Sequence, residues 1–308
     1  MKAHKLTLSA AALLLVMTCS PALAQNAPAD GDGPNAPAAQ NPRDNYKPLA
    51  DDAKQSATDK AAAIVGTEPS SAVTYKTFTS GAGATLFRWS ISAHGNVVRL
   101  ESPAAFEHLA AGVVGEGYVL SMNSPIGVIR YFDAGFTEST GCSGNLRAWS
   151  AAVFEQNPTA GGTTLIRDTC DGLWRLTQTF ARNAVNHELT ITMSLRNLAP
   201  FAQTNVRLDR YFDADVDADA GDDVFTRTAD AVAAQDGTLD NLSLTALTFN
   251  VGHATTIHSF GGWIPSITNQ AGLASPSGPG DFVGRVSYTL GTINSGLAKT
   301  VKVLYKRQ

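Results

Sequence analysis

A repeated alternation of apolar and polar residues constrains this chain more than any other feature. From about Ser71 onward, segments such as Val73–Phe78 and Thr85–Ile91 carry an apolar residue at nearly every second position. A period of two puts every second side chain on the same face of an extended strand. No amphipathic helical stretch of convincing length interrupts the pattern, and Pro103–Leu109 is the one place where a helical turn is expected. The sequence therefore predicts an all-β fold.

Glycine, asparagine, aspartate and proline separate the strand candidates, and glycine alone occurs 27 times. Further strands are expected at 97–100, 117–121, 127–132, 146–154, 163–168, 174–180, 188–195, 229–234, 242–249, 255–260, 282–290 and 299–305. Many short strands with regular turn signals are typical of sandwiches and barrels. We predict a large antiparallel β-sandwich, or two stacked sandwich halves, over residues 66–308, with a candidate sub-boundary near residue 182.

The N-terminus has the layout of a secretory signal. A basic segment, Met1–Lys5, precedes the apolar run Leu6–Met17, and small residues occupy positions −3 and −1 before a cleavage site after Ala24. This layout predicts a signal peptide of residues 1–24. The apolar run is too short to span a bilayer comfortably, which takes roughly 20 residues. Lipidation at Cys19 is a second, less favoured way to process the same segment.

Residues 25–65 form a compositionally distinct segment rich in alanine, proline and aspartate. Large apolar side chains are almost absent, so the segment cannot bury enough surface to offset the entropy of ordering it. We predict a disordered spacer.

The charge balance bears on the compartment and on the partners. Loss of residues 1–24 removes two lysines and changes the formal net charge from −4 to −6. A nucleic-acid partner is not expected, because phosphate binding needs a basic field. No second apolar run of membrane length follows, so we expect a soluble secreted or periplasmic protein without a transmembrane segment.

Two cysteines, Cys142 and Cys170, remain after the signal peptide is removed. An even pair in an oxidising compartment predicts one disulfide. It would close a loop of 28 residues, which stabilises a fold by roughly 3 kcal/mol in the chain-entropy model. A metal ligand or nucleophilic thiol is the alternative, although neither cysteine has the spacing of a zinc motif.

Seven aspartates fall within fifteen positions between Asp209 and Asp223. Four of them alternate, and in an extended strand they would repel one another on one face. Calcium would neutralise them, because it takes 6–8 oxygen ligands, yet the stretch does not match the EF-hand pattern. The predicted calcium ligands are Asp213, Asp215, Asp217, Asp219 and Asp222. A solvated acidic loop that protects a sheet edge and a set of catalytic carboxylates are the alternatives.

The strand before this loop carries charges on both faces. Arg207, Asp209 and Tyr211 share one face, whereas Arg210 lies on the other, apolar face. A buried arginine needs a carboxylate partner. The candidate partners are Asp133 and Glu116. The alternative is a strand end where Arg210 reaches solvent.

One five-residue sequence occurs twice. Arg130–Ala134 and Arg210–Ala214 both read Arg-Tyr-Phe-Asp-Ala, eighty positions apart. A duplication would make the two strands equivalent members of two related halves. The alternative is a chance repeat in a strand-rich chain, since the flanking residues do not match.

The C-terminal half resembles bacterial immunoglobulin-like surface modules in two places. Leu195–Leu208 is similar to a strand, turn and strand of those modules, and Leu290–Val303 is similar to their closing strand, with Leu-Gly, a later Gly and Thr-Val. The matched span covers about residues 187–305. The resemblance implies a sandwich architecture in a secreted or envelope setting and, by itself, no activity.

Several catalytic motifs are absent from the sequence. His187-Glu188 does not continue into the HExxH motif of zinc proteases, and Ser143 lacks the glycine spacing of the nucleophile elbow. The phosphate-binding P-loop and the dinucleotide-binding glycine pattern are also missing. We therefore do not expect the protein to bind or convert a nucleotide.

Aromatic side chains in turns are candidate platforms for sugar rings. Trp263 lies in the loop-like Phe260–Pro265, and Trp174 follows the turn at Asp171–Gly172. Sandwich cores also use tryptophan, so the core is the alternative place for these rings. The predicted ligand-binding residues are Trp174, Trp263 and Tyr211.

Two functions from different classes fit these features. The leading hypothesis is a non-catalytic secreted or envelope-associated sandwich that is stabilised by calcium and binds a polysaccharide or a protein. The alternative is a carbohydrate-active hydrolase or lyase, which needs two carboxylates about 5–10 Å apart. The candidate carboxylates are Glu116, Asp133 and Asp209. A third hypothesis is that the protein acts as an inhibitor-like partner of host proteins.

Overall fold

The computed structural model describes residues 74–109, 115–124, 127–135, 142, 147–216, 222–236, 241–259 and 278–308. Regular structure in these ranges consists of sixteen strands and one 3-10 helix, Gly83–Thr85, so the predicted all-β fold is confirmed. No helix in the described ranges is long and apolar enough to cross a membrane. The predicted signal peptide and spacer lie outside the described residues.

A three-stranded antiparallel sheet begins the described chain. It consists of β1 (Thr74–Ser80), β2 (Phe87–Ser92) and β3 (Val97–Glu101), in that order. β2 and β3 form the hairpin expected from the sequence, and its turn contains Gly95 at a φ of 85°. This positive φ favours glycine, because other residues rarely adopt it.

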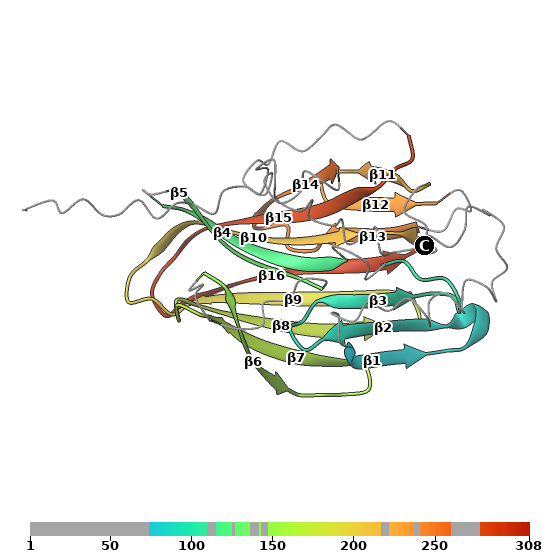
Figure 1. Cartoon of the computed structure of the whole chain (residues 1–308), viewed down its shortest axis with the longest axis horizontal. Helices are drawn as coiled ribbons and strands as arrows, with labels where there is room; N and C mark the ends of the chain where they lie inside the picture. Colours follow the sequence, from blue (N-terminus) through green and yellow to red (C-terminus); the bar gives the residue numbers. More distant parts are fainter. Residues whose placement is uncertain are drawn as a thin grey trace, which may run out of the picture. The chain divides into compact units, whose positions relative to one another are not determined.

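Five strands form the second antiparallel sheet, with β10 at its centre (Figure 1). In order, they are β14 (Gly252–Ser259), β15 (Phe282–Ile293), β10 (Gln203–Asp213), β4 (Glu116–Ser124) and β5 (Gly127–Ala134). Strands from both halves of the sequence therefore share this sheet, which we call the five-stranded sheet.

The third sheet has eight antiparallel strands. In order, they are β11 (Val224–Arg227), β12 (Ala231–Gln235), β13 (Asn241–Ala246), β16 (Ala298–Arg307), β9 (Glu188–Asn197), β8 (Trp174–Asn183), β7 (Gly162–Thr169) and β6 (Trp149–Gln156). β8 and β9 pair along their whole length, including Arg182 with Leu189. The sheet therefore runs through the sub-boundary expected near residue 182.

The strands alternate as the sequence predicts, with one face of each turned into a common core. In β9, Leu189, Ile191, Met193 and Leu195 are buried between more exposed residues. Phe212 of the five-stranded sheet contacts Tyr305 of the eight-stranded sheet edge-on, with ring centroids 6.0 Å apart. Each large apolar side chain buried in this way contributes about 1.5–3 kcal/mol.

The segment that resembles immunoglobulin-like modules does not form a separate unit. Residues 187–305 supply β9, most of β16 and other strands to the eight-stranded sheet, and β10, β14 and β15 to the five-stranded sheet. Strands from earlier in the chain complete both sheets, so the hydrophobic core is shared.

Two local features differ in how well the sequence predicted them. A disulfide joins Cys142 to Cys170, with Cα atoms 5.2 Å apart, as expected from the cysteine count.

The segment Pro103–Leu109, in contrast, forms no helical turn. The Glu107 carboxylate instead accepts hydrogen bonds from the amides of Leu100 and Leu109, which ties the segment back onto β3.

Candidate functional site

Three polar regions meet at β10, although this strand is buried from Leu208 to Asp213. One region lies on the side that faces the eight-stranded sheet, the second on the opposite side, and the third at the end of the strand. Burial of so many polar groups is costly unless each has a partner or a ligand. Each region is therefore a candidate site.

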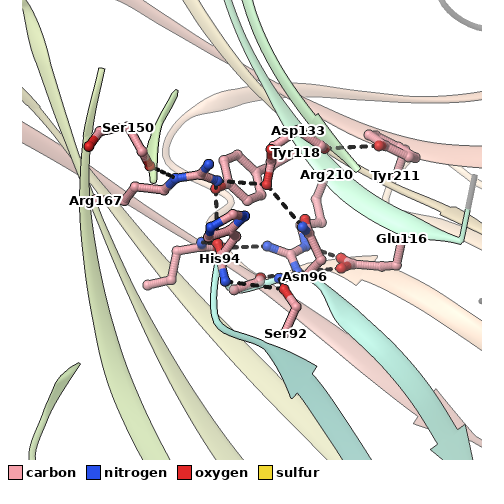
Figure 2. A network of polar contacts seen from close by, with 12 residues as sticks. Ser92, His94, Asn96, Glu116, Tyr118, Asp133, Ser150, Arg167, Arg210 and Tyr211 are labelled. Atoms are coloured by element: carbon pink, nitrogen blue, oxygen red, sulfur yellow. Dashed lines mark hydrogen bonds and ion pairs between the residues drawn. The ribbon is translucent and has the colours of Figure 1, made fainter. Parts of the chain in front are cut away.

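The inner network is the set of four charged residues Glu116, Asp133, Arg167 and Arg210 on the core side of β10 (Figure 2). Arg210 binds Glu116 through two nitrogens, and its Nη2 lies 2.6 Å from Glu116 Oε2. Arg167 Nη1 lies 2.7 Å from Asp133 Oδ2. All four residues are at most 2% exposed. Two arginines from different sheets therefore neutralise two buried carboxylates.

Neutral groups satisfy much of the remaining hydrogen-bonding capacity. The Glu116 carboxylate also accepts bonds from the Val97 amide at 2.6 Å and the Tyr305 hydroxyl at 2.8 Å. Asn96 donates to Asp133 at 2.9 Å. Since Tyr305 belongs to β16, and Asn96 and Val97 to the β2–β3 hairpin, the inner network connects all three sheets.

The inner network is a poor candidate for catalysis. Burial raises the pKa of Glu116, and the adjacent Arg210 opposes that shift. Glu116 and Asp133 are both fully buried and paired with arginines, so neither can meet a substrate in this structure. The network also identifies Glu116 as the carboxylate partner of Arg210.

The repeated Arg-Tyr-Phe-Asp-Ala sequences lie in the same sheet but are not equivalent. Ser121 of β4 pairs with Arg130 of β5 on one side and with Arg207 of β10 on the other. The two copies are therefore offset by three residues along the sheet. Because side chains alternate with period two, Arg130 and Arg210 point to opposite faces.

The second region, the outer polar face, covers the other side of the five-stranded sheet. Paired residues in neighbouring strands share a face, so the register defines its members. The outer polar face contains Arg130, Ser121, Arg207, Asp209, Tyr211, Arg285, Ser287, Thr289, Thr256 and His258. The face thus carries both charge signs, hydroxyl groups and an imidazole.

Asp209 and Arg285 form the centre of the outer polar face. Arg285 Nη1 lies 3.8 Å from Asp209 Oδ2, and Arg285 Nε donates to Thr256 Oγ1 at 3.0 Å. Ser287, which pairs with Asp209 in the sheet register, also interacts with its carboxylate and lowers its pKa. Burial raises the pKa of Asp209, which Arg285 and Arg207 oppose. Burial lowers the pKa of nearby His258 to about 4.

The outer polar face is partly open at one end. Arg130 and Arg207 are half-buried, and Thr289 is exposed, whereas Asp209 and Arg285 are buried deeper along the strands. Arg130 Nε has no hydrogen-bond partner among the described residues. Arg130, Ser121, Arg207 and Thr289 occupy one row across four strands, which we call the arginine row.

The third region, the acidic corner, is the group Asp213, Asp215 and Asp281, with Asp223 beside it. One carboxylate oxygen from each of the first three residues lies within 4.8 Å of the others. The predicted ligands Asp213 and Asp215 therefore come together. Asp222 is exposed and is not part of this group among the described residues, and Asp217 and Asp219 lie outside them. Asp281 was not predicted.

The predicted aromatic ligand-binding residues are not presented to solvent where they are described. Trp174 is fully buried in the core. Tyr211 is 1% exposed, donates its hydroxyl to the Asp133 carbonyl at 3.0 Å and stacks on Phe132. Neither ring offers a free face for a sugar in this structure, and Trp263 lies outside the described residues.

Comparison with known proteins shows the fold only. No family model and no curated protein matches the sequence. A solved bacterial glucoamylase complexed with acarbose has 9% identity and a TM-score of 0.52, over 77% of this chain and 32% of the glucoamylase chain. This chain thus spans about a third of that protein.

Two further solved structures are more distant. A putative aldose 1-epimerase from Escherichia coli K12 has 11% identity and a TM-score of 0.39, over 76% of this chain and 99% of that one. A polysaccharide lyase has 12% identity and a TM-score of 0.33, over 64% and 26%. None of these three is named as an immunoglobulin-like module.

Proposed function

We propose that this protein binds an acidic carbohydrate outside the cytoplasm, at the arginine row of the outer polar face. The observation that carries the proposal is the placement of Arg130 and Arg207 on either side of Ser121, all on one face. Their strands are separated by one intervening strand, so their backbones lie about 10 Å apart. Two half-buried cations at this spacing can hold one extended ligand between them.

The side chains of the arginine row match the chemistry of a uronate-containing saccharide. A guanidinium group binds a carboxylate through two parallel hydrogen bonds. The hydroxyl groups of Ser121 and Thr289 can each donate and accept, as sugar hydroxyls do. The whole chain has a formal charge of −4, so the positive charge of this row is a local feature. The glucoamylase that shares the fold, solved with acarbose, supports a carbohydrate as the ligand class.

Export is part of the proposal. The sequence begins with a predicted signal peptide and spacer, and the disulfide between Cys142 and Cys170 suits an oxidising compartment. We therefore place binding in the periplasm or outside the cell.

Turnover of the carbohydrate is a second candidate function. It is favoured by Asp209, with a raised pKa, and by His258, with a pKa lowered to about 4, on one face. Displaced pKa values of this kind are common among general acids and bases. The deep burial of Asp209 favours binding without turnover.

Calorimetric titration of the purified protein with acidic and neutral saccharides tests the binding proposal. Oligomers of galacturonate and of mannuronate represent the acidic class, and maltooligosaccharides the neutral class. We expect binding of an acidic oligomer, weakened about tenfold by Arg130→Ala or Arg207→Ala, which corresponds to about 1.4 kcal/mol. The matched control is Arg175→Ala, because Arg175 pairs with Asp168 on the eight-stranded sheet. Equal affinity for both classes, or unchanged affinity in both row variants, would contradict the proposal.

Asp209→Asn separates the two candidate functions once a ligand is found. If reducing ends appear in wild-type digests and disappear in this variant, while binding persists, the outer polar face is catalytic. Binding without new reducing ends in the wild type identifies a binding protein. Circular dichroism of the variant checks that its fold is retained.

A further inference from the structure

The acidic corner lies where three parts of the chain meet. Asp213 ends β10, and Asp215 follows two residues later. Asp281 directly precedes β15, whose Val283 pairs with Asp213. Asp213 and Asp215 are at most 4% exposed. The fold therefore gathers carboxylates from distant sequence positions into a buried place.

The separation of these oxygens suits one large cation. Oxygen atoms bound to a single Ca²⁺ at 2.3–2.6 Å lie at most about 5 Å apart. The oxygens of Asp213, Asp215 and Asp281 lie within 4.8 Å of one another. One ion can therefore contact all three without a large rearrangement.

Asp223 provides an independent indication of a ligand. It is fully buried, and its Oδ2 accepts a hydrogen bond from the amide of Val216, the neighbour of Asp215, at 3.0 Å. Its carbonyl accepts a bond from the amide of Gly280, the neighbour of Asp281, at 2.9 Å. Asp223 is thus held between two members of the corner, and its Oδ1 has no hydrogen-bond partner among the described residues.

The surroundings of Asp223 are acidic. The carboxylates of Asp215, Asp222 and Asp236 all lie close enough to act on its charge. A buried carboxylate surrounded by carboxylates is unfavourable unless a cation or a proton neutralises it.

We propose that the acidic corner is a calcium site, with Asp213, Asp215 and Asp281 as ligands and the buried carboxylate of Asp223 beside them. Calcium fits better than magnesium, because several carboxylates from the protein converge, whereas magnesium usually keeps several of its waters. The site goes beyond the proposed carbohydrate binding, and its test uses no carbohydrate. Calcium here joins the end of β10 to the starts of β11 and β15.

Calcium titration of EDTA-treated, dialysed protein tests the site. Calorimetry is expected to show one ion per chain. Melting followed by circular dichroism is expected to shift upward by about 5 °C or more at a hundredfold excess of calcium over Kd. Absence of both heat and shift in the wild type would overturn the proposal, as would equal affinity for magnesium.

The variants Asp215→Asn and Asp281→Asn locate the site. Each is expected to weaken calcium binding at least tenfold and to remove most of the calcium-dependent shift. In EDTA, both are expected to melt at or above the wild-type temperature, because each removes a repelling charge. That result also shows that the variants fold. Retention of the full calcium shift in both variants would overturn the ligand assignment.

Asp168→Asn is the matched control. Asp168 is a partly exposed aspartate paired with Arg175, away from the acidic corner in the register of the eight-stranded sheet. Its calcium affinity and calcium-dependent shift are expected to equal those of the wild type. Loss of the shift in this control as well would overturn the assignment to the acidic corner.

Discussion

The inner network and the acidic corner both contain buried carboxylates, and both involve β10, but they balance charge in opposite ways. In the inner network, Glu116 meets Arg210 and Asp133 meets Arg167 (Figure 2). In the acidic corner, Asp223 is surrounded by other carboxylates. The first region is electrostatically complete within the chain. For the second region we propose that a cation from solution balances the charge, which would make it a binding site rather than a purely structural device.

This comparison also shows why burial alone does not identify a functional site. A buried ion pair adds little net stability over an apolar replacement, but loss of one partner leaves an uncompensated charge. The two regions should therefore respond to charge removal with opposite signs.

The largest expected effect is in the inner network. Arg210→Met leaves Glu116 buried without its cation, and we expect the free energy of unfolding to fall by about 3–5 kcal/mol. Urea unfolding followed by the fluorescence of the buried tryptophans measures this loss. The double variant Arg210→Met, Glu116→Gln should recover a large part of it, because no buried charge is left unpaired.

An exposed pair supplies the matched control for that measurement. Arg175 binds Asp168 through two nitrogens at 2.7 and 2.8 Å, but its side chain is 41% exposed. Arg175→Met is expected to cost no more than about 1 kcal/mol. Equal losses from Arg210→Met and Arg175→Met would contradict the role assigned to burial.

A smaller effect is expected from pH, through the buried imidazole of His108 close to acidic groups. Burial lowers the pKa of His108 from 6.5 to about 4. Arg307 also lowers it, while Asp236 and Glu101 act in the opposite direction. Between these two pH values, the unfolded chain binds more protons than the folded one. Stability should therefore be fully present above pH 6.5 and fall as the pH drops toward 4, by up to about 3 kcal/mol.

Urea unfolding at a series of pH values, with His108→Gln as the variant, checks this prediction. The glutamine amide can replace the imidazole Nε2 that contacts the Ser102 carbonyl at 2.7 Å. The free energy of unfolding of the variant should fall less steeply between pH 6.5 and 4. Some fall should remain, because burial also lowers the pKa of His258. An identical slope in variant and wild type would refute the assignment to His108.

The smallest expected effect is in the acidic corner without metal. Asp223→Asn keeps this side chain uncharged at every pH and keeps an oxygen that can accept the bond from the Val216 amide. In EDTA we expect stability to stay equal or rise by up to about 1 kcal/mol, because like charges at close range destabilise. Thermal melting in EDTA measures this change. A large loss of stability would show that the two regions do not differ in the way described.

Much of the fold was predictable, because strand periodicity and turn residues are local signals. The alternation in β9 and β16, for example, shows directly which residues face the core. In β8, every second residue from Trp174 onward lies on one face, so Trp174 lies on the same face as the buried Leu176 and Phe180. The interpretation of Trp174 as a sugar platform relied on its neighbouring turn and did not use that signal.

The sites were less predictable, because they depend on strand pairing. Arg210 and Glu116 are 94 positions apart, and the sequence offered Asp133 equally as a partner. Asp281 joins Asp215 only because β10 pairs with β15. The alternation of Arg285, Ser287 and Thr289 with apolar residues did signal a polar face, but not which strands would extend it.

The three-residue offset between the repeated pentapeptides has a consequence for folding. β4 pairs with two strands that carry the same five residues, one on each edge. If either copy paired in the register of the other, its arginine and aspartate would exchange faces, and Arg210 would be lost from the core. The inner network thus disfavours a misaligned sheet, since only the native register places Arg210 against Glu116 and Asp133 against Arg167.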